Sequence, residues 1–169
     1  MRVSRRSICL EDKIKKADTL SRVIALLKVK GKKIVFTNGC FDILHFGHVK
    51  YLQDAKAKGD ILIVGINSDS SVRRLKGDKR PIVSQKDRAS VIAGLASVDF
   101  VTFFSEDTPF KLIARLKPDI LVKGADWNKD KIIGADLVRG WGGKVLAIRL
   151  APGRSTSNLI KKIAQLYQK

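Results

Sequence analysis

The segment KIVFTNGCFDILHFGHVKYLQDAKAKGDILIVGI, residues 33–66, predicts a strand, a turn, a helix and a second strand. Residues 33–37 form a short β-branched run that leads into an Asn-Gly pair, which is a turn signal. Residues 46–58 carry apolar side chains at helical spacing, and residues 60–66 form a nearly continuous apolar run. Such a run is typical of a parallel strand buried on both faces, so the segment predicts a βαβ unit.

The same alternation extends along the rest of the chain. The remaining apolar patterns predict helices over 17–31, 84–97, 108–117, 134–141 and 155–167 and strands over 100–104, 119–124 and 144–150. Repeated βα units predict an α/β fold with a doubly wound, mostly parallel five-stranded sheet and helices on both faces. Ligands bind such sheets beyond the carboxyl ends of the strands, so we expect the functional residues there.

Length and composition indicate one globular domain. The chain has 169 residues, of which 44% are hydrophobic and 30% are charged. We expect a basic N-terminal arm over 1–17 and a single domain over 18–169. No apolar run approaches the roughly 18–20 residues that span a bilayer, and the N-terminal segment is too short for a signal peptide. Two cysteines cannot frame a disulfide scaffold, which fits a reducing compartment. Together these observations predict a cytoplasmic protein.

The formal net charge of +18 predicts an anionic partner. Residues 1–33 hold eleven Lys or Arg against three acidic residues, residues 73–80 hold five against one, and residues 152–169 hold four against none. A nucleic-acid-binding module would carry such charge, and so would an enzyme for phosphorylated substrates. The 7% aromatic content and the lack of a zinc-finger, RRM or KH signature count against the first alternative.

The sequence His45-Phe46-Gly47-His48 opens the helix after the first predicted strand. Helix N-termini suit phosphate, Gly47 allows close approach, and two histidines three residues apart can face one ligand. A single histidine on a helix is usually structural, but these are the only two in the chain. A zinc site that adds Cys40 or Asp42 is an alternative, although no second Cys/His cluster supplies the remaining ligands.

The segment GCFDILHFGH (39–48) resembles the signature of the nucleotidyltransferase superfamily with the His-x-Gly-His motif. Three later segments are similar to the family of D-glycero-β-D-manno-heptose 1-phosphate adenylyltransferases, which includes the C-terminal half of a bifunctional heptose kinase/adenylyltransferase. These segments are VGINSDSSVRRLKGDKRPI (64–82), DILVKGADW (119–127) and RSTSNLIKKI (154–163). The chain departs from the family at Ala125, where the family usually has glycine, and it carries no kinase half.

The resemblance implies a Rossmann-like nucleotidyltransferase fold and transfer of AMP from ATP to a sugar 1-phosphate. The sugar phosphate would displace pyrophosphate in line, giving ADP-heptose for the lipopolysaccharide core, and a separate sugar kinase would act upstream. Mg²⁺ would accompany ATP and bridge its phosphates, so no protein metal ligand is expected. The family also implies a homo-oligomer without a membrane partner. The nearest alternative keeps the chemistry but uses CTP and a polyol phosphate such as glycerol 3-phosphate.

The resemblance also implies roles for individual residues. The catalytic pair is His45 and His48, which would stabilise charge on the transferring phosphates. The candidate nucleotide-binding residues lie at strand ends and at the last helix: Gly39, Cys40, Phe41, Gly47, Lys123, Gly124, Asp126, Arg154, Ser155 and Thr156. The candidate substrate-binding residues are Asp42, Asn67, Lys76 and Arg80. Simpler explanations compete at some of these, because Asp42 suits a turn, Lys76 a solvated loop and Ser155 or Thr156 a helix N-cap.

Overall fold

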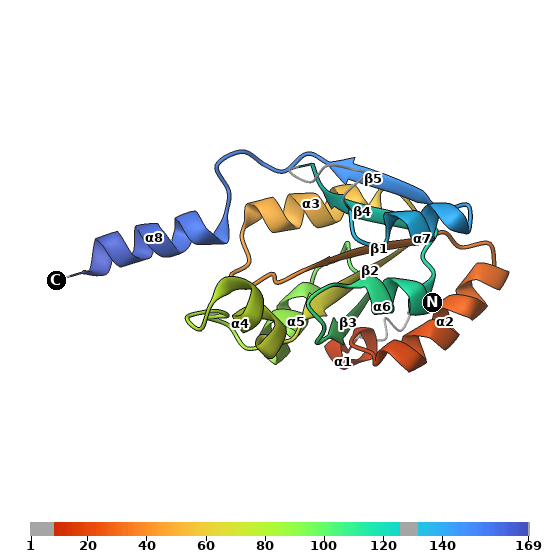
Figure 1. Ribbon diagram of the computed structural model, residues 1–169, viewed down its shortest axis with the longest axis horizontal. Coiled ribbons are helices and arrows are strands. Elements are labelled where there is room, and N and C mark those ends of the chain that lie inside the picture. Colours follow the sequence, from red (N-terminus) through yellow and green to blue (C-terminus); the bar gives the residue numbers. More distant parts are fainter. Residues whose placement is uncertain (1–8, 126–131, 169) are drawn as a thin grey trace, which may run out of the picture.

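Five parallel strands form one sheet in the computed structural model, which describes residues 9–125 and 132–168 (Figure 1). The strands lie in the order β3-β2-β1-β4-β5, and every neighbouring pair is parallel. They are β1 (Ile34–Gly39), β2 (Ile61–Asn67), β3 (Phe100–Phe104), β4 (Ile120–Gly124) and β5 (Lys144–Ile148). The predicted five-stranded parallel sheet is confirmed.

Helices cover both faces of this sheet, as the doubly wound pattern predicts. The helices are α1 (Leu10–Lys13), α2 (Ala17–Val29), α3 (Phe46–Lys56), α4 (Asp69–Lys76), α5 (Gln85–Ala93), α6 (Phe110–Leu116), α7 (Ala135–Gly140) and α8 (Thr156–Tyr167). One apolar cluster joins the sheet to α3 and α5, and the other joins it to α2, α6 and α7. The sheet therefore lies between two helical layers.

The two apolar clusters explain why the central strands are apolar at nearly every position. Along β1, Val35 belongs to the cluster that contains Leu52 of α3 and Ile92 of α5. The next residue, Phe36, belongs to the cluster that contains Leu20 of α2. Each of these side chains is almost fully buried, and burying one such side chain contributes about 1.5–3 kcal/mol. Alternate strand residues thus pack against opposite helical layers, which fixes the position of the sheet between them.

Several boundaries differ from the sequence prediction. Strand β1 continues through Asn38 and Gly39, because both residues pair with β2 where a turn was expected. Helix α6 begins at Phe110, with Pro109 as its N-cap residue. Helix α4 was not predicted, because it is short and Val72 is the only buried apolar residue in it. Ser68 caps α4 by accepting a hydrogen bond from the Ser71 amide at 3.2 Å.

Residues 13–15 of the predicted N-terminal arm contact the edge of the sheet. The Lys13 Nζ donates a hydrogen bond to the Val98 carbonyl at 2.8 Å, and Ile14 forms a parallel bridge with Val101 of β3. The Lys15 amide donates to the Val101 carbonyl at 2.9 Å. The division of the chain at residue 17 stays a prediction.

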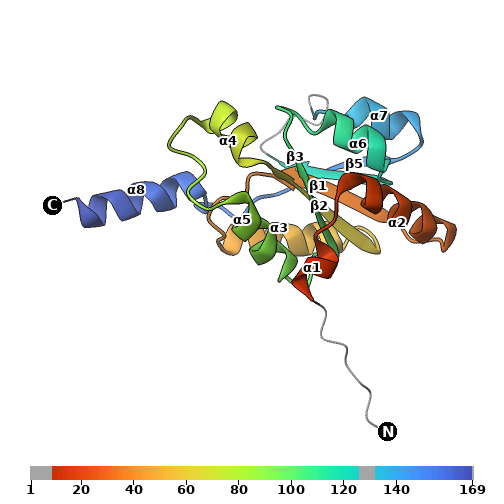
Figure 2. The ribbon, with the colours of Figure 1, turned by 90° about the horizontal axis from the view of Figure 1, so that it is seen from below.

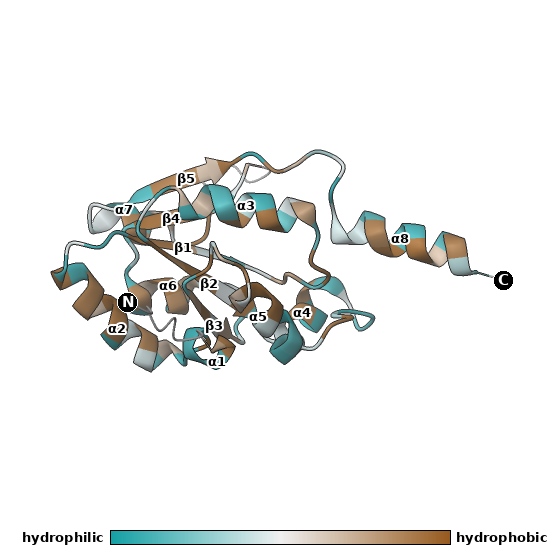
Figure 3. Cartoon of the chain, turned by 180° about the vertical axis from the view of Figure 1, so that it is seen from behind, coloured by the Kyte–Doolittle hydropathy of each residue, from teal (hydrophilic) through white to brown (hydrophobic). Residues whose placement is uncertain are grey.

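Helix α8 projects away from the rest of the domain, as Figures 1 and 2 show. None of its residues is buried, although apolar side chains repeat along it and appear as brown bands in Figure 3. Its apolar residues Leu159, Ile160, Ile163 and Leu166 therefore lie outside the apolar core of the described domain. No helix in the described ranges is long and apolar enough to cross a membrane.

Gly65 of β2 lies opposite Asn38 and leaves no room for a side chain. A Cβ at Gly65 would lie 2.9 Å from Phe36 Cζ and 3.1 Å from Leu112 Cδ2. We therefore expect Gly65→Ala to lower the free energy of unfolding by about 1–3 kcal/mol, because the packed layer must shift. Urea denaturation measures this change.

Gly140 offers a matched control for that substitution. It lies in α7, and an added Cβ there meets no atom of the described chain within 4 Å. We expect Gly140→Ala to leave stability unchanged or to raise it slightly, since alanine loses less conformational freedom than glycine. Equal effects of the two substitutions would contradict the close packing at Gly65.

Candidate functional site

A cavity of about 750 Å³ opens at the carboxyl ends of β1, β2 and β4. The ends of these strands, the start of α3, the end of α4 and the start of α8 line it. Every predicted site residue within the described ranges lies on this cavity, and Asp126 falls outside them. The topology therefore brings together residues that are up to 117 positions apart, from Gly39 to Thr156.

The chain leaves β1 through a tight left-handed turn. Phe41 has φ of +47°, a backbone conformation that bulky residues rarely adopt. Gly39 makes this turn possible, because a Cβ there would lie 3.1 Å from the Phe41 ring. The turn sends Asp42 toward the loop after α4 and returns the chain to open α3 at the cavity.

The two predicted catalytic histidines lie side by side at the start of α3. His45 is the N-cap residue and His48 follows in the first turn, and their rings stack with centroids 3.9 Å apart. The Phe41 ring packs edge-on against His48 at 5.2 Å. A Cβ on Gly47 would come within 3.0 Å of both the His45 ring and the Arg154 Cβ. Glycine at this position therefore allows the start of α3 to approach the segment before α8.

The surroundings of both histidines lower their pKa values, which favours the neutral imidazoles near pH 7. Burial, helped by the neighbouring His45, lowers the pKa of His48 from 6.5 to about 4. Burial and then the positive charge of Arg154 lower the pKa of His45 as well. Within the described chain, His45 Nδ1, His45 Nε2 and His48 Nδ1 are buried and have no hydrogen-bond partner. Because unpaired buried polar atoms cost free energy, these three nitrogens indicate a place for a polar ligand.

Basic side chains surround the histidine pair and make the cavity suitable for an anion. Lys76, Arg80, Lys123 and Arg154 all line it. Lys123 lies at the end of β4, and its Nζ donates a hydrogen bond to the Asn38 carbonyl at 3.3 Å. Cations that converge on one cavity attract and orient phosphate groups.

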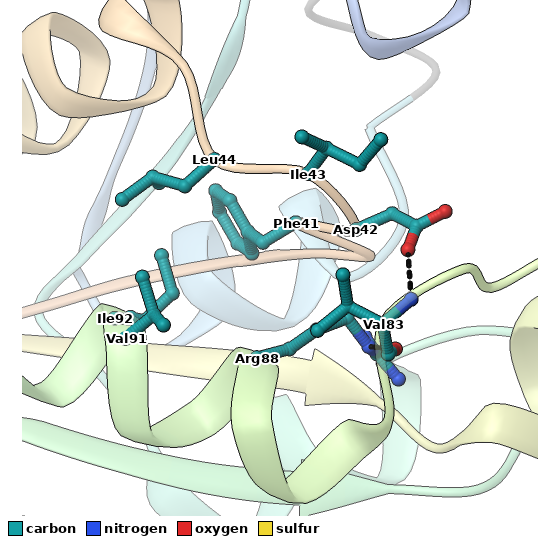
Figure 4. A pocket seen from close by; sticks show the side chains of 8 residues that line it. All are labelled: Phe41, Asp42, Ile43, Leu44, Val83, Arg88, Val91 and Ile92. Atoms are coloured by element: carbon teal, nitrogen blue, oxygen red, sulfur yellow. Dashed lines mark hydrogen bonds between the residues drawn. The ribbon is translucent and has the colours of Figure 1, made fainter. Parts of the chain in front are cut away.

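Asp42 lines the cavity, but protein groups already surround its carboxylate. Its Oδ1 accepts hydrogen bonds from the amides of Ile82 at 2.8 Å and Val83 at 2.9 Å. Its Oδ2 accepts one from Arg80 Nε at 2.5 Å, and the side chain is 0% exposed. Figure 4 shows the carboxylate directed at the Val83 amide, beside a small apolar cavity of about 120 Å³ between this turn and α5.

Helix α8 presents hydroxyl groups at the cavity through its first residues. Ser155 is the N-cap residue, as one of the two sequence alternatives predicted, and its Oγ accepts a hydrogen bond from the Asn158 amide at 3.1 Å. Thr156 Oγ1 donates to the Ile43 carbonyl at 3.4 Å, which ties α8 to the β1–α3 turn. The start of α8 therefore serves the fold and also borders the cavity.

Asn38 and Arg88 are among the polar residues at or near the cavity that were not predicted as site residues. Asn38 appeared only as part of a turn signal, yet its buried Oδ1 lines the cavity and lacks a partner among the described residues. Arg88 is fully buried in α5 and bonds to the carbonyls of Val83, Asn67 and Cys40. The sequence offered one signal that Arg88 is buried. It lies four residues before Ile92, and this spacing places both residues on the inward face of α5.

The described residues do not form the zinc site that the sequence left as an alternative. Among residues 9–125 and 132–168, no group of three or more His, Cys, Asp or Glu side chains could hold a metal ion. Burial raises the pKa of the Cys40 thiol, which opposes the thiolate that zinc requires. Asp42 is already paired with Arg80.

Comparison with known proteins places the chain in a group of nucleotide-handling enzymes. The sequence profile described as cytidylyltransferase-like matches residues 36–165. The chain is 54% identical over 155 residues to the bifunctional protein HldE of Geobacter metallireducens and 51% identical to that of Geobacter sulfurreducens. Each alignment covers 92% of this chain and 32% of the relative, so the chain spans about a third of the length of these relatives.

Two solved structures share the fold. A lipopolysaccharide core biosynthesis protein from Thermoplasma volcanium is 33% identical with a TM-score of 0.57, over 72% of this chain and 98% of the other. Pantoate-β-alanine ligase from Francisella tularensis, solved with an ATP analogue and β-alanine, is 16% identical with a TM-score of 0.60. That alignment covers 92% of this chain and 79% of the ligase, and it supports the fold alone.

The depressed pKa of His48 predicts how stability depends on pH. The unfolded chain binds a proton near pH 6.5, whereas the folded chain resists it down to about pH 4. The stability that the folded protein gains from keeping His48 neutral is therefore fully present above about pH 6.5 and is lost as the pH falls toward 4. We expect His48→Gln to lose less stability than the wild type between about pH 7 and pH 5, as measured by thermal unfolding.

Lys50→Ala on the exposed face of α3 is the control for this comparison, since it leaves both histidines in place. It should keep the wild-type slope. A His48→Gln slope equal to that of the wild type would show that His48 titrates normally in the folded protein.

Proposed function

This chain belongs to the cytidylyltransferase-like family of nucleotidyltransferase enzymes, and we propose that it transfers AMP from ATP to D-glycero-β-D-manno-heptose 1-phosphate. The stacked pair His45 and His48 carries the proposal, because its unpaired buried nitrogens face a cavity ringed by cations. The sugar substrate is supported by the likeness to HldE and to a lipopolysaccharide core biosynthesis protein. The family match over residues 36–165 confirms the predicted nucleotidyltransferase family.

The reaction is a direct displacement at phosphorus. An oxygen of the sugar 1-phosphate attacks the α-phosphorus of ATP, the bond from that phosphorus to the bridging oxygen breaks, and pyrophosphate leaves with the electron pair. Such a step needs alignment and charge neutralisation more than covalent catalysis. As neutral imidazoles, His45 and His48 each donate one N–H to phosphate oxygens, and anionic phosphate raises their affinity for a second proton.

The nucleotide would lie across the ends of β1 and β4. Backbone amides of Cys40 and Phe41 and the open space over Gly47 suit its phosphates. Arg154, Ser155 and Thr156 at the start of α8 would bind the β- and γ-phosphates. The end of β4 would hold the nucleoside through Lys123, Gly124 and Asp126, the last of which lies outside the described residues.

The sugar phosphate would lie on the α4 side of the histidine pair. Lys76 ends α4, and Arg80 follows in the loop after it. Asn67 ends β2 on the same side of the cavity, where its Nδ2 donates a hydrogen bond to Ser71 Oγ at 3.0 Å. Arginine and lysine here would bind the 1-phosphate and hold it in line with the α-phosphorus.

Mg²⁺ would reach this site with ATP. Asp42 and Asp107, the carboxylates of the described cavity wall, are both paired with arginines, so the donor set fits an ion that keeps phosphate and water ligands. When bound, the ion would neutralise charge on the triphosphate. The histidines and the cationic side chains of the chain would then orient the phosphate groups.

The proposal extends to partners. The HldE relatives are named bifunctional, and this chain spans about a third of their length; a kinase that supplies the sugar phosphate stays a prediction. A homo-oligomer stays a prediction, supported by the exposed apolar stripe of α8. Family membership and the cavity for phosphates now account for part of the positive charge that motivated a nucleic-acid-binding alternative.

Removing either imidazole should slow the reaction without unfolding the protein. We expect His45→Ala and His48→Ala each to reduce turnover by about 10²-fold or more, because each removes a contact to the charge of the transition state. Release of pyrophosphate measures the rate, and thermal unfolding checks the fold. Lys50→Ala, on the same helix, should keep the wild-type rate, whereas wild-type rates in both histidine variants would contradict the site.

Competition among nucleotides separates the proposed reaction from its nearest alternative. With the heptose phosphate and Mg²⁺, we expect pyrophosphate release from ATP to exceed that from CTP. The opposite order, together with turnover of glycerol 3-phosphate, would identify a cytidylyltransferase for a polyol phosphate. Tight, steeply salt-dependent binding to duplex DNA, with no turnover of any phosphate acceptor, would favour the nucleic-acid-binding module.

A further inference from the structure

Two buried charged side chains, Asp42 and Arg88, bind the loop between α4 and α5 beside the cavity. On one side, Asp42 accepts hydrogen bonds from the amides of Ile82 and Val83. On the other side, Arg88 Nε donates to the Val83 carbonyl at 3.0 Å, while its terminal nitrogens bond to the carbonyls of Cys40 and Asn67. The loop is thus attached at adjacent backbone groups to the ends of β1 and β2.

The Asp42 carboxylate has no room for a substrate hydroxyl in this arrangement. Its side chain is 0% exposed, and three donors from residues 80–83 already occupy it. A buried carboxylate requires such partners, because an unpaired one would carry a large desolvation cost. Substrate could reach Asp42 only by displacing Arg80 or a backbone amide.

Arg80 is held by one edge of its guanidinium. Its Nε donates to Asp42, and its side chain remains 17% exposed where it lines the large cavity. Within the described chain, its two terminal nitrogens make no hydrogen bond. A guanidinium fixed at Nε with free terminal N–H groups is prepared to bind a phosphate through two parallel bonds.

We propose that Asp42 is a positioning residue that fixes Arg80 and residues 80–83, so that Arg80 binds the phosphate of the acceptor substrate. This inference rests on the proposed function and deepens it, since it replaces direct contact of Asp42 with the sugar by an indirect effect. Removing Asp42 then weakens binding of the sugar phosphate through Arg80 and leaves ATP binding largely unchanged.

Steady-state kinetics on the full chain test the indirect effect. In Asp42→Asn, the amide oxygen can still accept the bonds from Ile82 and Val83, but the ion pair with Arg80 is lost. We expect the KM for the sugar phosphate to rise at least about tenfold, as for a lost charge-assisted contact, while the KM for ATP stays near the wild-type value. Asp18→Asn, which breaks the exposed pair with Arg115 far from the cavity, should change neither constant.

A double-mutant comparison distinguishes positioning from direct contact. If Asp42 acts through Arg80, Asp42→Asn has little further effect on the KM for the sugar phosphate once Arg80→Ala is present. If Asp42→Asn raises that KM by the same factor with and without Arg80, Asp42 contacts the substrate directly and the proposal is overturned. An unchanged KM in Asp42→Asn would overturn it as well.

Hydrogen exchange tests the attachment of the loop without any substrate. We expect the amides of Ile82 and Val83 to exchange faster in Asp42→Ala, while the amides of β2 stay protected and show that the domain is folded. Unchanged exchange at Ile82 and Val83 would contradict the proposal. If Asp42→Ala does not fold, Asp42→Asn in the kinetic experiment decides. Absence of turnover by the wild type would instead overturn the proposed function, and the exchange result would still be informative.

Discussion

The geometry of the site depends on how the chain leaves β1. Between Gly39 and Phe46 it must turn out of the sheet, cross the ends of the strands and begin a helix at the cavity. The left-handed conformation of Phe41 achieves this at a cost of order 1–3 kcal/mol, which the surrounding structure must offset. The turn needs the space over Gly39, and the start of α3 needs the space over Gly47. The space over these two glycines therefore fixes the position of the histidine rings.

Electrostatics then set what the rings can do. Burial lowers the pKa of both histidines, helped by Arg154 at His45 and by His45 at His48, so the neutral imidazoles that this favours do not add to the repulsion among the cations of the cavity. A bound polyphosphate changes this balance, because negative charge beside an imidazole favours its protonated form. The pair can thus supply N–H donors first and positive charge as negative charge accumulates on the phosphates.

The sequence predicted the sheet and the positions of the described candidates well, because both follow from local patterns. Apolar runs fixed β1, β2 and β4, and the rule that ligands bind at carboxyl ends located His45 and Lys123. What it could not supply were contacts between distant segments. The bonds from Asp42 to residues 80–83 join loops about 40 positions apart, and α4 has a single buried apolar residue to mark it. Arg88 was missed because a charged residue on an apolar face carries no local sign of its partners.

The chain has 34 basic and 16 acidic residues, so where the acidic residues lie matters as much as their number. Cations gathered to bind a polyanion repel one another, and a partly buried site screens that repulsion less than bulk water does. Asp42 opposes it from within the cavity wall, where its fully buried carboxylate pairs with Arg80. A carboxylate facing the cavity would repel the phosphates, whereas one placed behind an arginine holds the guanidinium in position. Burying the Asp42 carboxylate in the wall therefore lets one arrangement stabilise the protein and still leave the terminal nitrogens of Arg80 available to an anionic ligand.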